Sequence, residues 1–308
     1  MARLDVTKTY KLFVNGAFPR SESGRSWPIA GVDGETYAHL CLASRKDLRD
    51  AVEAAKPAQA KWASATAYNR GQVLYRLAEM MEGKRDELAA AIASVQATPA
   101  SKKPAREKTN KAKSLSSEAE VAMAIDRVVY YAGWCDKYSQ LLGCHNPVSG
   151  HFYNFTVPEA TGLVVVVCPD ALPLLGLISM LMPVLVPGNA AIVIPSEANP
   201  VASMVLAEGL ATSDLPAGVA NILTGKRSEL LPQITSHRDI DAVFASFSAS
   251  SASDVQLLRE GVAENLKRVT IAEDSLLAKV SLQSEGAQGL AWIEKFVEYK
   301  TIWHPAMA

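Results

Sequence analysis

The chain has 308 residues, 49% of them hydrophobic and 20% charged, as in a globular protein with one large domain or two ordinary ones. Its 31 basic and 32 acidic side chains give a net charge of −1, so no bulk field draws it to DNA or to an anionic membrane. The start resembles no signal peptide, and four cysteines without C-x-x-C spacing are typical of reduced cytosolic thiols. We expect a cytoplasmic protein with no nucleic-acid or membrane partner.

The amino-terminal part is expected to form a small antiparallel β-structure followed by helices. Within residues 11–40, Asn15-Gly16 is a strong signal for a two-residue hairpin turn. Ser44-Arg-Lys-Asp47 is similar to a capping box and is expected to begin a helix. Apolar residues at helical spacing predict a second helix through 74–95 and a third over 118–140.

The segment 99–117, PASKKPAREKTNKAKSLSS, carries six basic residues and one acidic residue. It has no aromatic residue to stack on bases, which argues against a nucleic-acid site. We interpret it as a solvated, mobile insertion.

The 34 residues 162–195 contain one charged side chain, that of Asp170, and are long enough to raise the question of a membrane span. Internal prolines and the Pro-Gly-Asn at 187–189 divide the stretch into pieces of strand and helix size, and no basic cluster flanks it. Strands of a parallel sheet covered on both faces are also continuously apolar. A buried α/β core is therefore the better interpretation.

From residue 161 onward, short apolar runs alternate with helix-sized segments. The runs are Leu163–Val167, Ala190–Ile194, Val219–Leu223, Asp241–Ala245 and Arg268–Ile271, and the helices include 174–186, 199–212 and 251–264. This alternation predicts an α/β fold, with a Rossmann-like parallel sheet and helices on both faces. Ligands in such sheets bind beyond the carboxyl ends of the strands. The candidate site residues by position are Asp170, Ser196, Glu197, Thr224, Gly225 and Ser246 to Ser248.

The chemistry at these positions stays open. Glu197 is suited either to accept from a ribose hydroxyl or to stabilise a helix N-terminus. The sequence has no G-x-G-x-x-G and no P-loop motif, and its five histidines show no triad or metal spacing. Cys168 ends an apolar strand and is better explained as a small buried hydrophobe than as a nucleophile.

The order of the segments resembles the aldehyde dehydrogenase family. The matching segments are CPDALP (168–173), MPVLVPGNAAIVIPSEANP (182–200), DLPAGVANILTG (214–225), SHRDIDAVFASFS (236–248) and LKRVTIAEDS (266–275). The early KLFVNGAFPRSESGRSW, YYAGWCDKY (130–138) and GLAWIEKFVEYKTIWHP (289–305) also match, so the resemblance covers almost the whole chain. It implies positions for NAD or NADP at Pro195, Ser196, Glu197, Gly225 and Ser246.

The sequence departs from the family's pattern where catalysis is expected. The family's oxyanion asparagine aligns with Ala171, beside Asp170, and alanine has no side-chain donor. Its general-base glutamate aligns with Ala272, and the neighbouring Glu273 would point to the opposite face of a strand. The resemblance therefore implies no catalytic residue here.

The cofactor positions depart as well. The family's lysine that meets the adenosine ribose is replaced by Ile194, and Phe247 stands where a phenyl ring can fill the space of the pyrophosphate or the nicotinamide. We expect the cofactor positions to be vestigial and any binding of NAD or NADP to be weak. No metal is expected.

The family's nucleophilic cysteine belongs to a separate domain that follows the segment matched by 266–275. Only 34 residues follow Asp274 here, the last cysteine is Cys168, and a short polar bridge, LQSEGAQ, leads to the final segment. A thiohemiacetal cannot form without a thiolate. The chain thus resembles the catalytically empty second unit of tandem two-unit aldehyde dehydrogenases.

The resemblance divides the chain into four parts, which are 1–142 (hairpin and helices), 143–160 (oligomerisation hairpin), 161–275 (Rossmann-like core) and 276–308 (bridge and C-terminal oligomerisation segment). It implies a pseudoenzyme subunit that oligomerises with itself or with a full-length aldehyde dehydrogenase. One alternative is an NAD(P)-dependent aldehyde oxidoreductase whose cysteine comes from a partner subunit. Another is a small-molecule sensor that uses Asp170 and Arg227 as polar groups in the vacated groove.

Overall fold

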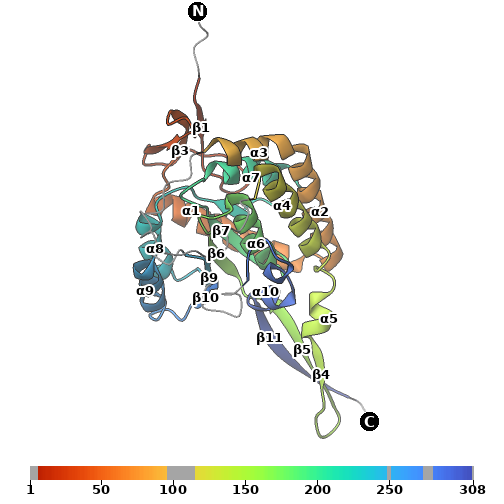
Figure 1. Cartoon of the computed structure of the whole chain (residues 1–308). Coiled ribbons are helices and arrows are strands. Elements are labelled where there is room, and N and C mark those ends of the chain that lie inside the picture. Colours follow the sequence, from red (N-terminus) through yellow and green to blue (C-terminus); the bar gives the residue numbers. More distant parts are fainter. Residues whose placement is uncertain (1–5, 96–114, 248–250, 273–279, 307–308) are drawn as a thin grey trace, which may run out of the picture.

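A five-stranded parallel sheet forms the centre of the protein, in a computed structural model that describes residues 6–95, 115–247, 251–272 and 280–306. The sheet has the strand order β10-β9-β6-β7-β8 (Figure 1). Its strands are β6 (Leu163–Val167), β7 (Ala190–Ile194), β8 (Ala220–Ile222), β9 (Ala242–Ala245) and β10 (Arg268–Ile271). The α/β fold and all five strands are confirmed, the strand ends to within one residue.

The apolar stretch 162–195 forms β6, the helix α6 (Pro173–Leu185) and β7. Every residue of β6 and β7 is buried, because helices cover both faces of the sheet at this point. None of the helices built from the described residues is long and apolar enough to cross a bilayer.

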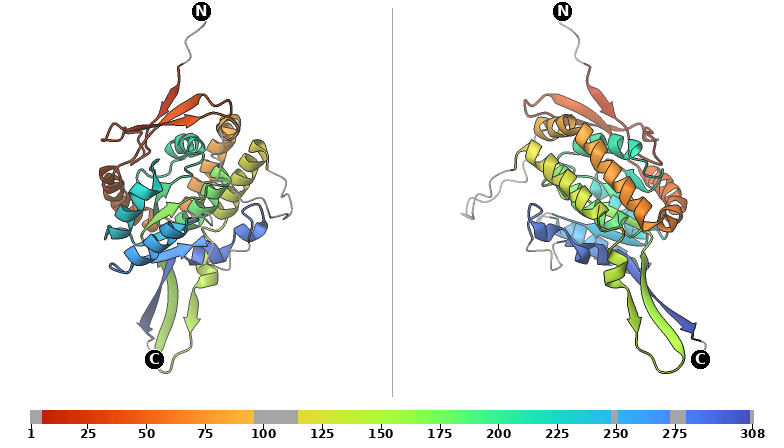
Figure 2. Two further views of the ribbon diagram at one scale, coloured as in Figure 1. Left: turned by 60° about the vertical axis from the view of Figure 1, so that its left-hand side comes forward. Right: turned by 90° about the vertical axis from the view of Figure 1, so that its right-hand side faces the viewer.

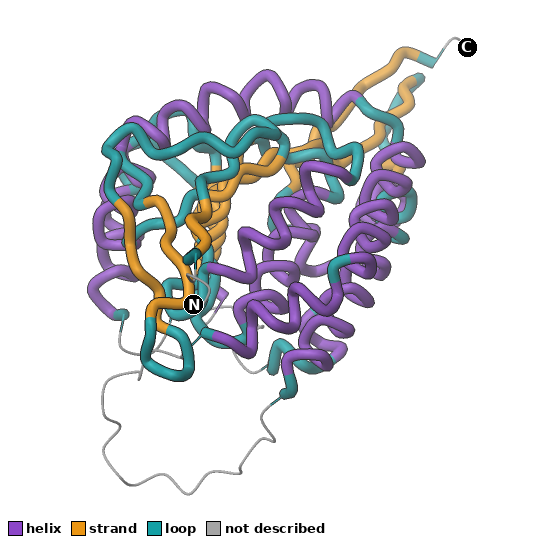
Figure 3. Tube along the Cα trace, turned by 90° about the horizontal axis from the view of Figure 1, so that it is seen from above, coloured by secondary structure: helices purple, strands orange, loops and turns teal. Residues whose placement is uncertain are grey.

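Helices lie on both faces of the sheet (Figure 3). One face packs against α1 (Arg45–Ser64), α8 (Arg227–Ser236) and α9 (Ala252–Gly261). The other packs against α6 and α7 (Val201–Thr212), and outside these lie α2 (Ala67–Gly83), α3 (Arg85–Ser94) and α4 (Ser117–Ala132). Residues of β6 alternate between the two cores, with Val165 facing α1 and Val166 facing α6.

Two of the three helices expected before residue 143 were predicted too long. The second divides at Lys84, whose φ of −108° and ψ of 15° leave the helical region, and Val95 lies beyond the end of α3 in extended conformation. The third ends at Ala132, and a separate short helix, α5, covers Tyr138–Leu142. The breaks escaped detection because the apolar residues on either side of each face the same core.

Of the basic segment 99–117, only residues 115–117 are described, and they lead into α4 through the N-cap Ser116. The interpretation of the rest as an insertion lies outside the described residues.

The amino-terminal strands form a small mixed sheet in the order β1-β3-β2, from β1 (Lys8–Tyr10), β2 (Ser26–Ala30) and β3 (Thr36–Cys41). The antiparallel pairing expected within residues 11–40 is that of β2 with β3, and β1, which precedes this range, pairs with β3 in parallel. The predicted turn is confirmed: Asn15 and Gly16 have φ values of 53° and 71°, as a two-residue hairpin turn requires. It docks on the edge of the central sheet, where Phe13 exchanges two backbone hydrogen bonds of 3.0 and 2.7 Å with Ile222 of β8.

The capping box at the start of α1 is confirmed, and it also holds the turn at residues 21–24, which precedes β2. The Asp47 carboxylate is buried and accepts from the Ser44 amide at 2.7 Å and from the Ser21 hydroxyl at 2.8 Å.

Replacing Asp47 by alanine is expected to lower the free energy of unfolding by about 1–3 kcal/mol, because the buried Ser21 hydroxyl and the half-buried Ser44 amide lose their acceptor. Urea denaturation followed by circular dichroism measures the change. Asp50→Ala, an exposed acid of the same helix, serves as the control and should change stability little. An equal loss of unfolding free energy in both variants would show that the hydrogen bonds of Asp47 with Ser21 and Ser44 do not stabilise the fold.

A separate sheet, the arm, is antiparallel throughout and projects from the body (Figures 1 and 2). It contains β4 (Cys144–Asn146), β5 (Phe152–Ala160) and β11 (Val297–Pro305) in the order β11-β5-β4. All nine residues of β11 pair with β5, from Val297 opposite Ala160 to Pro305 opposite Phe152. The arm therefore joins the hairpin before the core to a segment far along the chain.

A short segment between β10 and the arm closes one end of the core. It contains the 3-10 turn η3 (Glu285–Ala287) and the helix α10 (Leu290–Glu294). Trp292 and Phe296 are buried against Phe244 of β9, with ring centroids 5.9 and 5.0 Å apart from it. The Phe296 carbonyl accepts from the Asn189 side-chain amide at 2.9 Å. We call Trp292, Ile293 and Phe296 the seal.

Arg127 of α4 holds the start of this segment. Its Nη1 donates to the Leu282 carbonyl at 2.9 Å and to the Ser179 hydroxyl, and its Nη2 donates to the Ser284 carbonyl at 3.4 Å. The side chain is buried, and desolvation lowers the pKa of its guanidinium from the ordinary value. The bridge is thus fixed to the helices that cover the sheet.

Candidate functional site

The carboxyl ends of β6, β7 and β8 bring four of the predicted residues together. Asp170 follows β6, Ser196 and Glu197 follow β7, and Arg227 begins α8 after β8. This edge is where parallel sheets bind their ligands, because successive loops and helix N-termini open there.

Asp170 and Arg227 form a bidentate ion pair. Nη1 of Arg227 donates to Oδ2 at 2.9 Å, and Nη2 donates to Oδ1 at 2.7 Å. Nη2 also donates to the Cys168 carbonyl at 2.7 Å. The Arg227 side chain is 8% exposed and the Asp170 side chain 40%, so the guanidinium is the buried member of the pair.

The same carboxylate accepts from three further donors. Oδ1 of Asp170 receives the amides of Glu197 at 2.9 Å and Ala198 at 3.4 Å, and the Ser196 hydroxyl at 3.2 Å. Desolvation would raise the pKa of Asp170, but the hydrogen bonds and charge of Arg227 together with the two amides outweigh it and hold the pKa below its usual value. Asp170 is therefore a carboxylate and not a proton donor.

Glu197 caps α8. Its Oε1 accepts from the Arg227 amide at 2.6 Å, and its Oε2 lies 3.7 Å from Nζ of Lys226. Of the two roles that the sequence left open, the structure shows the stabilisation of a helix N-terminus.

Thr224 and Gly225, at the end of β8, support the segment that leads into α1. The Thr224 hydroxyl donates to the Cys41 carbonyl at 2.7 Å, and the Ala43 amide donates to the Thr224 carbonyl at 2.8 Å. A side chain at Gly225 would place its Cβ 3.4 Å from the Ala43 amide nitrogen. Both residues are thus in contact with protein rather than open to a ligand.

The comparisons with known proteins agree on one family. Residues 20–274 match the Aldehyde dehydrogenase family. The chain belongs to this family.

Among its relatives, the Bacillus subtilis (strain 168) protein DhaS, named as an aldehyde dehydrogenase, is 32% identical over 266 residues, which are 85% of this chain and 50% of DhaS. The cytosolic 10-formyltetrahydrofolate dehydrogenase of Xenopus laevis is 29% identical over 85% of this chain and 28% of its own length. The NAD+ complex of the Bacillus cereus aldehyde dehydrogenase superposes with a TM-score of 0.75 at 26% identity, over 85% of this chain and half of that chain. This aldehyde dehydrogenase family member thus spans about half the length of DhaS and of the solved structure, and less of the Xenopus protein.

In this family member, the groups that would meet a dinucleotide are engaged within the protein. A dinucleotide needs an acceptor for a ribose hydroxyl and free amides for its phosphates. The Glu197 carboxylate is used by Arg227 and Lys226, and the amides of Glu197 and Ala198 are used by Asp170. As arranged, these residues do not fit the cofactor.

The other cofactor positions lie in the core. Pro195 and Ile194 are buried, and Phe247 is 6% exposed, within the apolar cluster that contains residues of α1, α8 and α9. The Ser246 amide donates to the Val167 carbonyl at 3.0 Å and continues the pairing of β9 with β6. The Phe247 ring thus packs into the protein beneath the strand ends. Ser248 lies outside the described residues.

Of the three degenerate catalytic positions, Asp170 forms the ion pair described above, and the other two carry small apolar side chains. Ala171 is exposed in the loop after β6, and Ala272 is half-buried after β10. Glu273, the neighbouring acid, lies outside the described residues. Cys168 is fully buried, and burial raises the pKa of its thiol to about 12, which confirms it as a structural residue.

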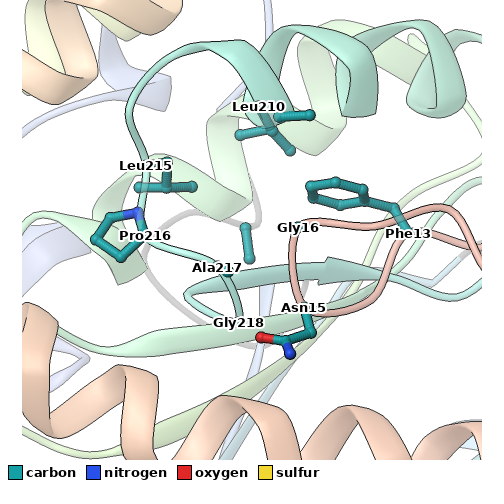
Figure 4. Close-up of a pocket in the computed structure, with 10 residues that line it drawn as sticks. Phe13, Asn15, Gly16, Leu210, Leu215, Pro216, Ala217 and Gly218 are labelled. Carbon is teal, nitrogen blue, oxygen red and sulfur yellow. The ribbon is translucent and has the colours of Figure 1, made fainter.

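A cavity of about 170 Å³ lies at the opposite end of β8 (Figure 4). Phe13 and Leu210 face it from two sides, the loop 215–218 closes a third, and the Asn15 amide points away. It is small, and no charged side chain lines it. The edge with Asp170 and Arg227 therefore remains the candidate site.

Proposed function

We propose that this chain is a non-catalytic member of the aldehyde dehydrogenase family that works as a structural or regulatory subunit. It assembles through its arm with a second copy of itself or with a full-length aldehyde dehydrogenase. The observation that carries the proposal is the arm, a projecting sheet with large aromatic side chains in solvent.

Four aromatic residues of the arm are each about half exposed, namely Phe152 (46%), Tyr153 (56%), Tyr299 (48%) and Trp303 (58%). Phe152 and Trp303 pack edge to face near the tip, with centroids 5.8 Å apart. Within the described part of the chain, the outer edges of β4 and β11 have no strand partner. Exposed aromatic groups beside open strand edges are features that partner chains bind.

Two observations support the absence of catalysis. Cys168 is the last cysteine of the sequence, and it is buried at the end of β6. The chain also passes from β10 to the arm through a short segment whose apolar residues fill the core, so the body is closed without the domain that carries the family's nucleophile. An isolated chain is expected to have no aldehyde oxidation activity.

Replacing both Phe152 and Trp303 by serine is expected to weaken assembly at least about thirtyfold, because the loss of even one buried aromatic anchor costs about 2 kcal/mol or more at an interface. Analytical ultracentrifugation measures this for the chain alone and with full-length aldehyde dehydrogenases from its own organism. Tyr68→Ser, which removes an exposed aromatic of α2, is the matched control. A wild-type chain that stays monomeric with every such partner would refute the proposal.

The alternative is an NAD(P)-dependent oxidoreductase whose cysteine comes from a partner subunit. The retained parallel sheet and its carboxyl edge favour this alternative. The Glu197 carboxylate and the amides of Glu197 and Ala198 oppose it, because they are already bonded within the protein. Titration of NAD and NADP into the purified chain and its complex separates the two, because the alternative requires binding. Heat and a thermal shift at millimolar cofactor would support the alternative, and their absence would end it.

A further inference from the structure

We propose that Asp170 is the internal occupant of an anion site, and that its carboxylate stands where the phosphate of a ligand would bind. The carboxyl edge of β6 and β7 is thereby closed to nucleotides by the chain itself. This inference concerns a different surface from the arm, and it holds or fails independently of assembly.

The donor set is that of a phosphate site. Around one carboxylate converge both Nη atoms of Arg227, the consecutive amides of Glu197 and Ala198, and the Ser196 hydroxyl, at 2.7 to 3.4 Å. A guanidinium fork, neighbouring backbone amides and a hydroxyl are the groups with which proteins hold phosphate oxygens. Asp170 is the single acceptor that they share.

The cation of this site is fixed in place. The Arg227 side chain is 8% exposed, its Nη2 donates to the Cys168 carbonyl, and the Arg227 amide donates to the Glu197 carboxylate. Its Nε is buried and has no hydrogen-bond partner. The donors would therefore keep their positions if the acceptor changed, and an unsatisfied N–H would remain beside them.

The anion is the movable member. Asp170 lies in the loop between β6 and α6 and is 40% exposed. The same loop contains Leu172 in the left-handed region, with φ of 53°, a conformation that is unfavourable for leucine. The Cys168 carbonyl of this loop would keep its bond to Arg227 Nη2, whereas removal of the Asp170 carboxylate leaves Nη1 of Arg227 and the amide of Glu197 without the acceptor they have now.

The test is a gain of function in Asp170→Ala. Isothermal titration and thermal shift assays use inorganic phosphate, ADP and NAD at constant ionic strength, with wild type beside the variant. Wild type is expected to bind none of them at millimolar concentration, and Asp170→Ala is expected to bind phosphate at least about tenfold more tightly and to gain thermal stability from it. Tighter binding of ADP than of phosphate would extend the site to a nucleotide, and equal binding would limit it to the phosphate group.

Matched variants make the result specific. The double variant Asp170→Ala, Arg227→Ala is expected to lose the binding that Asp170→Ala gains. Glu229→Ala removes an exposed acid of α8, the helix that Arg227 begins, and breaks its ion pair with Arg25; this variant is expected to gain no binding. If the alanine variant does not fold, Asp170→Asn keeps the shape of the side chain without its charge and is expected to gain binding to a smaller degree. A folded variant of either kind without any gain, or a wild-type chain that binds phosphate as tightly as the variants, overturns the inference.

Discussion

Replacing Phe296 by alanine is expected to lower the free energy of unfolding by about 3–5 kcal/mol. The ring is 1% exposed and contacts Phe244 in the centre of the sheet, so truncation leaves a cavity in the seal. The backbone at this residue also accepts from Thr161 and Asn189, which keeps the neighbouring chain from collapsing into the gap. Urea denaturation at neutral pH, monitored by tryptophan fluorescence and circular dichroism, measures the loss.

Tyr299→Ala is the control for this prediction. It removes an aromatic ring of similar size three residues further along, where 48% of the residue is exposed. It is expected to cost less than about 1 kcal/mol. A similarly small cost for Phe296→Ala would show that the seal is not part of the cooperative core, and the body would then need a partner to cover this end.

Arg227→Ala is expected to cost about 2–3 kcal/mol at neutral pH. Loss of one member of a buried ion pair costs about 3–5 kcal/mol, and the 40% exposure of Asp170 reduces this because water stabilises the carboxylate left behind. The Cys168 carbonyl also loses a donor. Arg25→Ala, which breaks the exposed pair with Glu229, should leave the unfolding midpoint nearly unchanged.

The same pair predicts a pH dependence. The pKa of Asp170 is lower in the folded chain than its ordinary value, so the folded state binds this proton less readily than the unfolded state. The stabilisation that ionised Asp170 gives the folded state is therefore complete above its ordinary pKa of about 4. It is lost as the pH falls through the lower pKa that Asp170 has in the folded chain. The free energy of unfolding of wild type should exceed that of Asp170→Asn by less and less below about pH 4. A difference that grew on acidification would contradict a lowered pKa of Asp170 in the folded chain.

Much of the fold was predictable because its strongest signals are local. A strand covered on both faces must be apolar at every position, so β6 and β7 stand out in the sequence without any partner. The division at Lys84 was not predictable, since apolar residues keep helical spacing on both sides of it. Whether a helix continues through a residue such as Lys84 depends on tertiary packing and not on the spacing of the apolar residues.

The location of the site at one edge of the sheet was predictable, but the hydrogen bonds between its side chains were not. Asp170 and Arg227 were both recognised as polar groups of one edge, but as groups facing an open groove. No local signal says that side chains 57 positions apart meet each other. Arg127 was missed for a similar reason, although one signal existed: it lies on the buried stripe of α4 with Ala124 and Tyr131. Its partners, the carbonyls of the bridge, have no signature in the sequence.

The pairing of β5 with β11 also sets a time scale for synthesis. Thr156 and its partner Thr301 are separated by 145 positions. At roughly 5–20 residues per second, β5 leaves the ribosome about seven to thirty seconds before β11. During that interval it is paired only with the short β4, as a two-stranded hairpin of marginal stability with one free edge. A partner co-translated with this chain therefore meets an open strand, whereas a partner mixed with the purified protein meets a finished arm.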